Sequence, residues 1–101
     1  MASRLIWSPE AIGDIESIAE YISKDSVYYA KSVVRGLLEK AKRIIDYPEI
    51  GRIVPEMENF MIREVFVHHY RVVYKISDTD IIIVAVIHGK RLLDNVFDRF
   101  N

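Results

Sequence analysis

The chain has 101 residues, of which 50% are hydrophobic and 29% are charged, so a disordered chain is excluded and a single domain over residues 1–101 is expected. Its 14 basic and 15 acidic residues give a net charge of −1, which excludes a generally basic nucleic-acid-binding surface but not a local patch. The absence of cysteine excludes disulfides, thiol nucleophiles and thiolate metal sites.

The N-terminal half is predicted to contain one strand and two helices. Residues 3–8 are rich in branched and aromatic side chains, which favour a strand. Ser8-Pro9 then indicates a helix start, because serine caps a helix N-terminus and proline is tolerated at the first helical position. Apolar residues at helical spacing predict a second helix over residues 27–46, which ends because the residue before Pro48 avoids helical angles.

The C-terminal half is predicted to be mainly strands. Residues 48–59 are expected to be irregular, and side chains then alternate with a period of two, which indicates strands over residues 61–68 and 70–77. Residues 78–80 are typical of a hairpin turn. The next strand, residues 81–87, is apolar in every position, so we expect it to be a central strand covered on both faces.

The order of these elements predicts an α+β domain in which an N-terminal strand and a helical hairpin precede a three-stranded antiparallel meander. Gly36 is predicted to let the second helix approach the first closely, since glycine has no Cβ. Residues 91–100 are expected to form a C-terminal helix or an extended tail.

No metal, cofactor or paired-carboxylate chemistry is predicted. The sequence has no glycine-rich phosphate loop, zinc-ligand spacing or nucleophile elbow. His68 and His69 are adjacent on a predicted strand, so their side chains point to opposite faces and do not chelate one ion. Glu56, Glu58 and Glu64 are expected to be solvated charges.

The charged residues that suggest a site are basic and lie in the half of the chain predicted to form the sheet or in the loop that leads into it. Arg71 and Arg91 would meet if the last two strands form a hairpin, and guanidinium groups bind phosphate or carboxylate with two hydrogen bonds. The sequence therefore predicts an anion-binding or target-binding site formed by Arg52, Arg63, Arg71, Lys90 and Arg91. The alternative is that these residues, together with Lys75 and His88, form surface ion pairs with Glu64, Asp94 and Asp98.

Several short motifs occur in an order that resembles one protein family. They are IWSPEA at residues 6–11, PEIGR at residues 48–52, YRVVY at residues 70–74 and VIHGKR at residues 86–91. Together they resemble the RelE/ParE toxin superfamily over nearly the whole chain. The resemblance implies the toxin half of a type II toxin–antitoxin system, a class that includes plasmid stabilisation proteins.

The resemblance implies two alternative activities. RelE-like toxins cut mRNA on the ribosome, whereas ParE-like toxins bind and inhibit DNA gyrase. Arg71 and Arg91 match two arginines of the RelE pattern, but Glu64 and Phe97 stand where that pattern has a catalytic lysine and tyrosine. A glutamate repels a phosphate and phenylalanine exchanges no proton, so the resemblance favours a gyrase inhibitor that is not an enzyme.

Two other functions stay open at this point. The first is a RelE-like endoribonuclease that uses Arg71, Arg91 and, as general base, His88. The second is a degenerate family member without toxicity.

The resemblance also implies a small antitoxin as partner, with a heterotetramer as one assembly, in addition to gyrase or, alternatively, the ribosome and mRNA. Apolar surface is expected to stay exposed for such a partner, because a domain this small has little material to cover both faces of residues 81–87. Val33, Leu37 and Leu38 are assigned mainly to the core, with partner contact as the alternative. The apolar runs are too short for a membrane span and the N-terminus is unlike a signal peptide, so the cytoplasm is expected.

Overall fold

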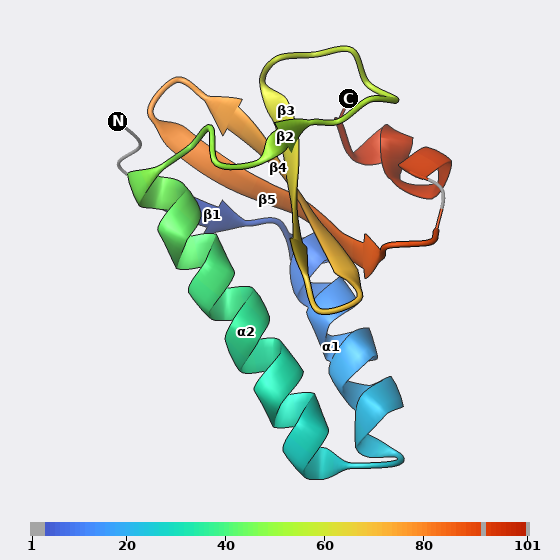
Figure 1. Ribbon diagram of the computed structural model, residues 1–101. Coiled ribbons are helices and arrows are strands. Elements are labelled where there is room, and N and C mark those ends of the chain that lie inside the picture. The colour runs from blue at the N-terminus through green and yellow to red at the C-terminus, as the bar shows by residue number, and fades with distance from the viewer. Residues whose placement is uncertain (1–3, 92, 101) are drawn as a thin grey trace.

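The computed structural model describes residues 4–91 and 93–100 and places two long helices against one five-stranded sheet (Figure 1). In chain order the elements are β1 (Arg4–Trp7), α1 (Pro9–Ser23), α2 (Val27–Asp46), β2 (Arg52–Ile53), β3 (Ile62–Val67), β4 (Tyr70–Ser77), β5 (Asp80–His88) and the 3-10 helix η1 (Leu93–Phe100). The strand order is β1-β5-β4-β3-β2, with β1 parallel to β5 and the other neighbours antiparallel. The predicted α+β fold is confirmed.

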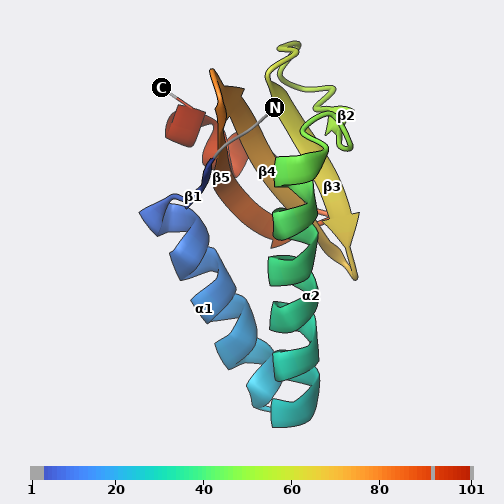
Figure 2. The same ribbon diagram turned by 90° about the vertical axis from the view of Figure 1, so that its left-hand side faces the viewer.

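Both helices begin where the sequence predicts. The hydroxyl of Ser8 accepts a hydrogen bond from the backbone N–H of Ala11 at 3.0 Å, and Pro9 is the first residue of α1. The hydroxyl of Ser26 caps α2 in the same way, by accepting from the N–H of Tyr29 at 3.0 Å. The two helices form a hairpin whose tip extends well beyond the sheet (Figure 2).

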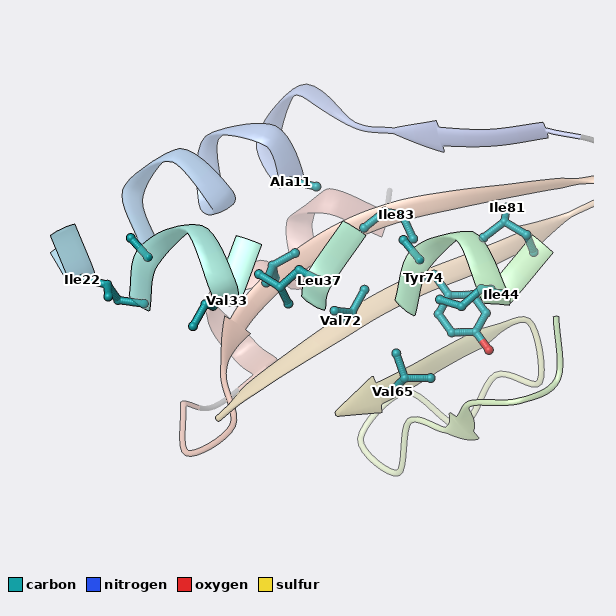
Figure 3. Close-up of a cluster of buried hydrophobic side chains, with 13 residues drawn as sticks. Ala11, Ile22, Val33, Leu37, Ile44, Val65, Val72, Tyr74, Ile81 and Ile83 are labelled. Carbon is teal, nitrogen blue, oxygen red and sulfur yellow. The ribbon is translucent and has the colours of Figure 1, made fainter. Parts of the chain in front are cut away.

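Two hydrophobic cores lie on the two faces of the sheet. The larger core joins the helices to the sheet and includes Val33 and Leu37 from α2 with Val72 and Ile83 from the strands (Figure 3). The smaller core lies on the other face and is formed by Val54, Ile62, Val73, Ala85, Ile87, Leu93 and Val96. Because β5 contributes to both cores, it is covered on both faces, as its apolar sequence predicts.

Exposed apolar surface therefore lies elsewhere than expected. The second face of β5 is covered by η1 and by the segment that precedes β3. The expectation that this strand leaves apolar surface open is therefore wrong. Large apolar side chains are exposed instead on the helical hairpin, among them Tyr21, Val27, Tyr28, Tyr29 and Leu38.

Two further expectations need correction. A Cβ at Gly36 would lie 3.0 Å from Nε2 of His68, so this glycine allows α2 to approach the end of β3 and not α1. The predicted irregular segment contains the short strand β2, which pairs with Glu64 and Arg63 of β3. Neither contact has a local signal, because each partner lies many residues away along the chain.

The phenol of Tyr74 fastens the chain between α2 and β2 to the centre of the sheet. Its hydroxyl donates to the carbonyl of Pro48 at 2.6 Å and accepts from the N–H of Gly51 at 3.0 Å. The side chain is fully buried, and this burial raises the pKa of Tyr74 above the ordinary value for tyrosine.

Tyr74→Phe is expected to lower the free energy of unfolding by about 1–3 kcal/mol, because the buried N–H of Gly51 loses its acceptor. Since the folded-state pKa of Tyr74 is raised, the wild-type advantage is fully present below about pH 10 and shrinks as the pH rises further, where only the unfolded phenol ionises. Urea unfolding as a function of pH measures both effects, and Tyr47→Phe, at an exposed tyrosine, is the control. A pH-independent difference between wild type and Tyr74→Phe would contradict this prediction.

Candidate functional site

Three charged side chains from neighbouring strands meet on the sheet face opposite the helices. Nη1 of Arg71 on β4 lies 2.7 Å from Oε1 of Glu64 on β3, and Nε of Arg52 on β2 lies 2.6 Å from Oε2. Strand register brings them together, because Arg52 is directly opposite Glu64 and Arg71 is one diagonal step away across β3 and β4. Each oxygen of the carboxylate is thus held by a different guanidinium group.

The ion pair at the centre of this group is buried. Glu64 is 1% exposed and Arg71 is 6% exposed, so the prediction that Glu64 is a solvated charge is wrong. Nη2 of Arg71 also donates to the backbone carbonyl of Arg91 at 3.0 Å and lies 3.5 Å from the carboxylate of Glu56. The charge of Arg71 is therefore neutralised inside the protein, and its guanidinium holds the chain that follows β5.

Two other cations of the predicted site have separate surroundings. Arg63 donates to the backbone carbonyls of Gly51 and Phe60 at 2.9 and 3.3 Å, so it supports the chain on either side of β2. The side chain of Arg52 remains 60% exposed, and its guanidinium lies 5.4 Å from the ring centroid of Phe66. Of these two arginines, Arg52 is the one that presents charge to solvent.

A hollow of about 530 Å³ lies between α1 and the end of β5. Its lining consists of Asp14, Ser17, Ile18, Tyr21, Tyr70, Val86, Ile87, His88 and Arg91. The ring of His88 lies 5.7 Å from that of Tyr70, edge to face. Burial and the neighbouring phenols of Tyr29 and Tyr21 raise the pKa of Tyr70, so this phenol stays neutral.

The structure therefore divides the predicted cations into groups. His88 and Arg91 share the hollow with exposed Lys90 beside them in the chain, whereas Arg71 lies among carboxylates and reaches only the backbone of Arg91. Lys75 is half-buried on β4.

One ion pair at this end of the molecule has no signal in the sequence. Arg99 of η1 makes two hydrogen bonds to Asp14 of α1, at 2.7 and 3.2 Å, and the pair raises the pKa of Arg99. The same carboxylate accepts from the N–H of Val86, where β5 extends beyond β1. Because 85 residues separate the two partners, only the folded chain reveals the pair.

A groove of about 700 Å³ lies between the two helices. Its apolar lining includes Val27, Val34 and Leu38, and charged residues of both signs line it too, namely Glu20, Lys31, Arg35, Glu39 and Lys42. Val27 and Leu38 are 58% and 42% exposed, so apolar surface is open to solvent here. An apolar floor with charged edges suits an amphipathic helix of a partner.

Within residues 4–91 and 93–100, no three histidine, cysteine, aspartate or glutamate side chains are grouped so that they could hold a metal ion. No helix in the described part of the chain has the length and hydropathy needed to cross a membrane.

Comparison with known proteins agrees with the fold and the motifs. The chain is similar to Toxin RelE2 of Caulobacter vibrioides, with 30% identity over 91 residues that cover 89% of this chain and 99% of the relative. In structure it resembles a protein of the chromosomal ParDE TA system from P. aeruginosa, with a TM-score of 0.72 and 18% identity over 89% of this chain and 98% of that one.

The structure also resembles a mutant of the E. coli toxin RelE in the free state, with a TM-score of 0.67 and 17% identity over 98% of this chain and 94% of that one. At these identities the two solved structures support the fold alone. The family model described as "ParE toxin of type II toxin-antitoxin system, parDE" matches residues 5–93. This match spans most of the chain, and the chain therefore belongs to the ParE toxin family of type II toxin–antitoxin systems.

Proposed function

We propose that this toxin acts by binding and inhibiting DNA gyrase and does not cleave RNA. The observation that carries the proposal is the buried ion pair of Arg71 and Glu64, at 2.7 Å. Attack of a ribose 2′-OH on its phosphate builds up negative charge, which fixed cations must stabilise. Here the carboxylate of Glu64 neutralises the central guanidinium and would repel the phosphate, which argues against cleavage.

Target contact is assigned to the cations that face solvent, namely Arg52, Lys90 and Arg91. These side chains are exposed, and Lys90 and Arg91 form no ion pair with any residue in the described segments. Arg63 and Arg71 would act indirectly, by holding the backbone that carries the exposed charges.

The purified toxin is expected to block supercoiling by purified gyrase, and Arg91→Gln is expected to raise the inhibitory concentration roughly tenfold through loss of one charged contact. Arg4→Gln is the matched control, because Arg4 is also an exposed arginine but is paired with Asp80 at the edge strand. Unchanged supercoiling together with arrested translation would contradict the proposal.

A RelE-like endoribonuclease is the second candidate. Two observations favour it: a relative with 30% identity is named Toxin RelE2, and His88 and Arg91 line the same hollow. In this alternative His88 acts as general base and Arg91 stabilises the phosphate, while Arg71 holds the backbone of Arg91. Primer extension on mRNA from expressing cells would then show cuts at the ribosomal A site that Arg71→Ala or His88→Gln abolishes.

Normal growth of cells expressing the toxin alone would instead identify a non-toxic member.

The proposed partner that neutralises the toxin is a small antitoxin whose amphipathic helix lies in the groove between α1 and α2. The support is the family match, the ParDE TA system to which a structural neighbour belongs, and the exposed apolar lining of this groove. The heterotetramer is the proposed assembly, and light scattering of the co-purified complex measures it.

A further inference from the structure

We propose that the carboxylate of Glu64 occupies an oxyanion-binding site formed by Arg52 and Arg71, so that phosphate groups bind there only when this carboxylate is absent. The proposal concerns ion binding by the chain itself. It goes beyond the choice of cellular target and does not depend on it.

The donors around Glu64 are those that bind a phosphate group. One guanidinium holds Oε1 at 2.7 Å and another holds Oε2 at 2.6 Å, each through one donor, and guanidinium groups bind carboxylates and phosphates alike through charge-assisted hydrogen bonds. The carboxylate thus occupies a site that offers one guanidinium donor to each of its two oxygens.

Each guanidinium group has a second contact besides the carboxylate. Nη2 of Arg71 donates to the backbone carbonyl of Arg91 at 3.0 Å, and the guanidinium of Arg52 lies over the ring of Phe66. Removal of the Glu64 side chain would therefore leave the two cations in place around an empty volume. The 60% exposure of the Arg52 side chain gives an ion from solvent a way to reach that volume.

Glu56 is the other acidic group near this site, and it competes less well. Its carboxylate lies 3.5 Å from Nη2 of Arg71 and its side chain is 37% exposed, whereas the Glu64 side chain is 0% exposed. A partly solvated carboxylate at this longer distance neutralises Arg71 only in part. A doubly charged phosphate therefore retains a net attraction to the two guanidinium groups once Glu64 is gone.

Thermal unfolding in inorganic phosphate, with ionic strength held constant by sodium chloride, tests the proposal. Glu64→Ala removes both the charge and the volume of the carboxylate, so phosphate is expected to raise its unfolding midpoint by about 5 °C or more once phosphate exceeds its Kd roughly tenfold. Wild type and Glu64→Gln should show no such rise, because in both the site is filled by a side chain. Adding Arg52→Gln to Glu64→Ala should remove the effect.

Asp80→Asn is the control for unspecific stabilisation, because it frees the exposed guanidinium of Arg4, and no response to phosphate is expected. An equal phosphate response of wild type would overturn the proposal, and so would no response of Glu64→Ala. If Glu64→Ala is unfolded in chloride, phosphate is expected to restore its folded circular dichroism spectrum, and an unfolded chain in both salts overturns the proposal. None of these measurements involves gyrase or toxicity, so their failure leaves the proposed function untouched.

Discussion

Arg71→Ala is expected to lower the free energy of unfolding by about 3 kcal/mol, because it leaves the buried carboxylate of Glu64 with only one cation. Removing one member of a buried ion pair costs roughly 3–5 kcal/mol in comparable cases. The lower end applies here, since Arg52 still holds the other oxygen of Glu64 at 2.6 Å. The variant also loses the hydrogen bond from Arg71 to the carbonyl of Arg91.

The double variant Arg71→Met with Glu64→Leu is expected to recover most of this loss. When both charges are replaced by apolar side chains of similar volume, the cost of burying the charges disappears together with their attraction. The site borders the smaller core through Val73, which is a neighbour of Arg71 on the same face of β4, so apolar replacements have apolar contacts. The ion pair therefore contributes little net stability to the fold, and its main effect is to fix where the two charges lie.

Urea unfolding of the wild type, Arg71→Met, Glu64→Leu and the double variant gives the coupling energy of the pair. The exposed pair of Arg4 and Asp80 is the matched control, and Arg4→Ala should change stability little because solvent screens that pair. If the double variant is as unstable as Arg71→Ala, the charges stabilise the fold themselves and the interpretation is wrong.

The features that could be predicted from the sequence are those that depend on residues close together in the chain. The hydroxyl of Ser8 and the ring of Pro9 determine the start of α1 within one turn, and α2 ends at Asp46 because Tyr47, the residue before Pro48, is not helical. Side-chain alternation predicted the strand β4, and in the structure its adjacent residues Val72 and Val73 lie in the larger and the smaller core.

What could not be predicted depends on strand register and on distant parts of the chain. The residue type of Glu64 does not show whether its side chain is solvated or buried in an ion pair, and the register that places it opposite Arg52 decides this. Arg71 was predicted to bind an anion, but the carboxylate that neutralises it is set by the pairing of β3 with β4. The sequence therefore shows which residues carry guanidinium groups. The strand register determines whether a carboxylate neutralises them or whether they can bind an external anion.

Leu37→Ala is expected to lower stability and Leu38→Ala to weaken antitoxin binding, although the two leucines are adjacent on α2. Leu37 is 0% exposed within the larger core, so its truncation leaves a cavity and should lower the free energy of unfolding by about 2–5 kcal/mol. Leu38 is 42% exposed in the groove between the helices, so its truncation should change stability little.

For antitoxin binding we expect the larger effect from Leu38→Ala if the antitoxin helix occupies this groove. Leu38→Ala removes an apolar contact from the proposed interface and should raise the Kd for the cognate antitoxin roughly tenfold. Leu37→Ala should leave the Kd nearly unchanged under conditions where the variant is folded. Urea unfolding and titration calorimetry measure the two quantities on the same protein preparations.

This pair of variants separates a core role from a partner role more cleanly than either does alone. The substitution, the helix and the loss of volume are identical, so only the direction of the side chain differs between them. If Leu38→Ala binds the antitoxin as tightly as wild type, the groove is not the binding surface. The exposed side chains at the tip of the hairpin, such as Tyr28 at 85% exposure, then become the apolar surface to test next.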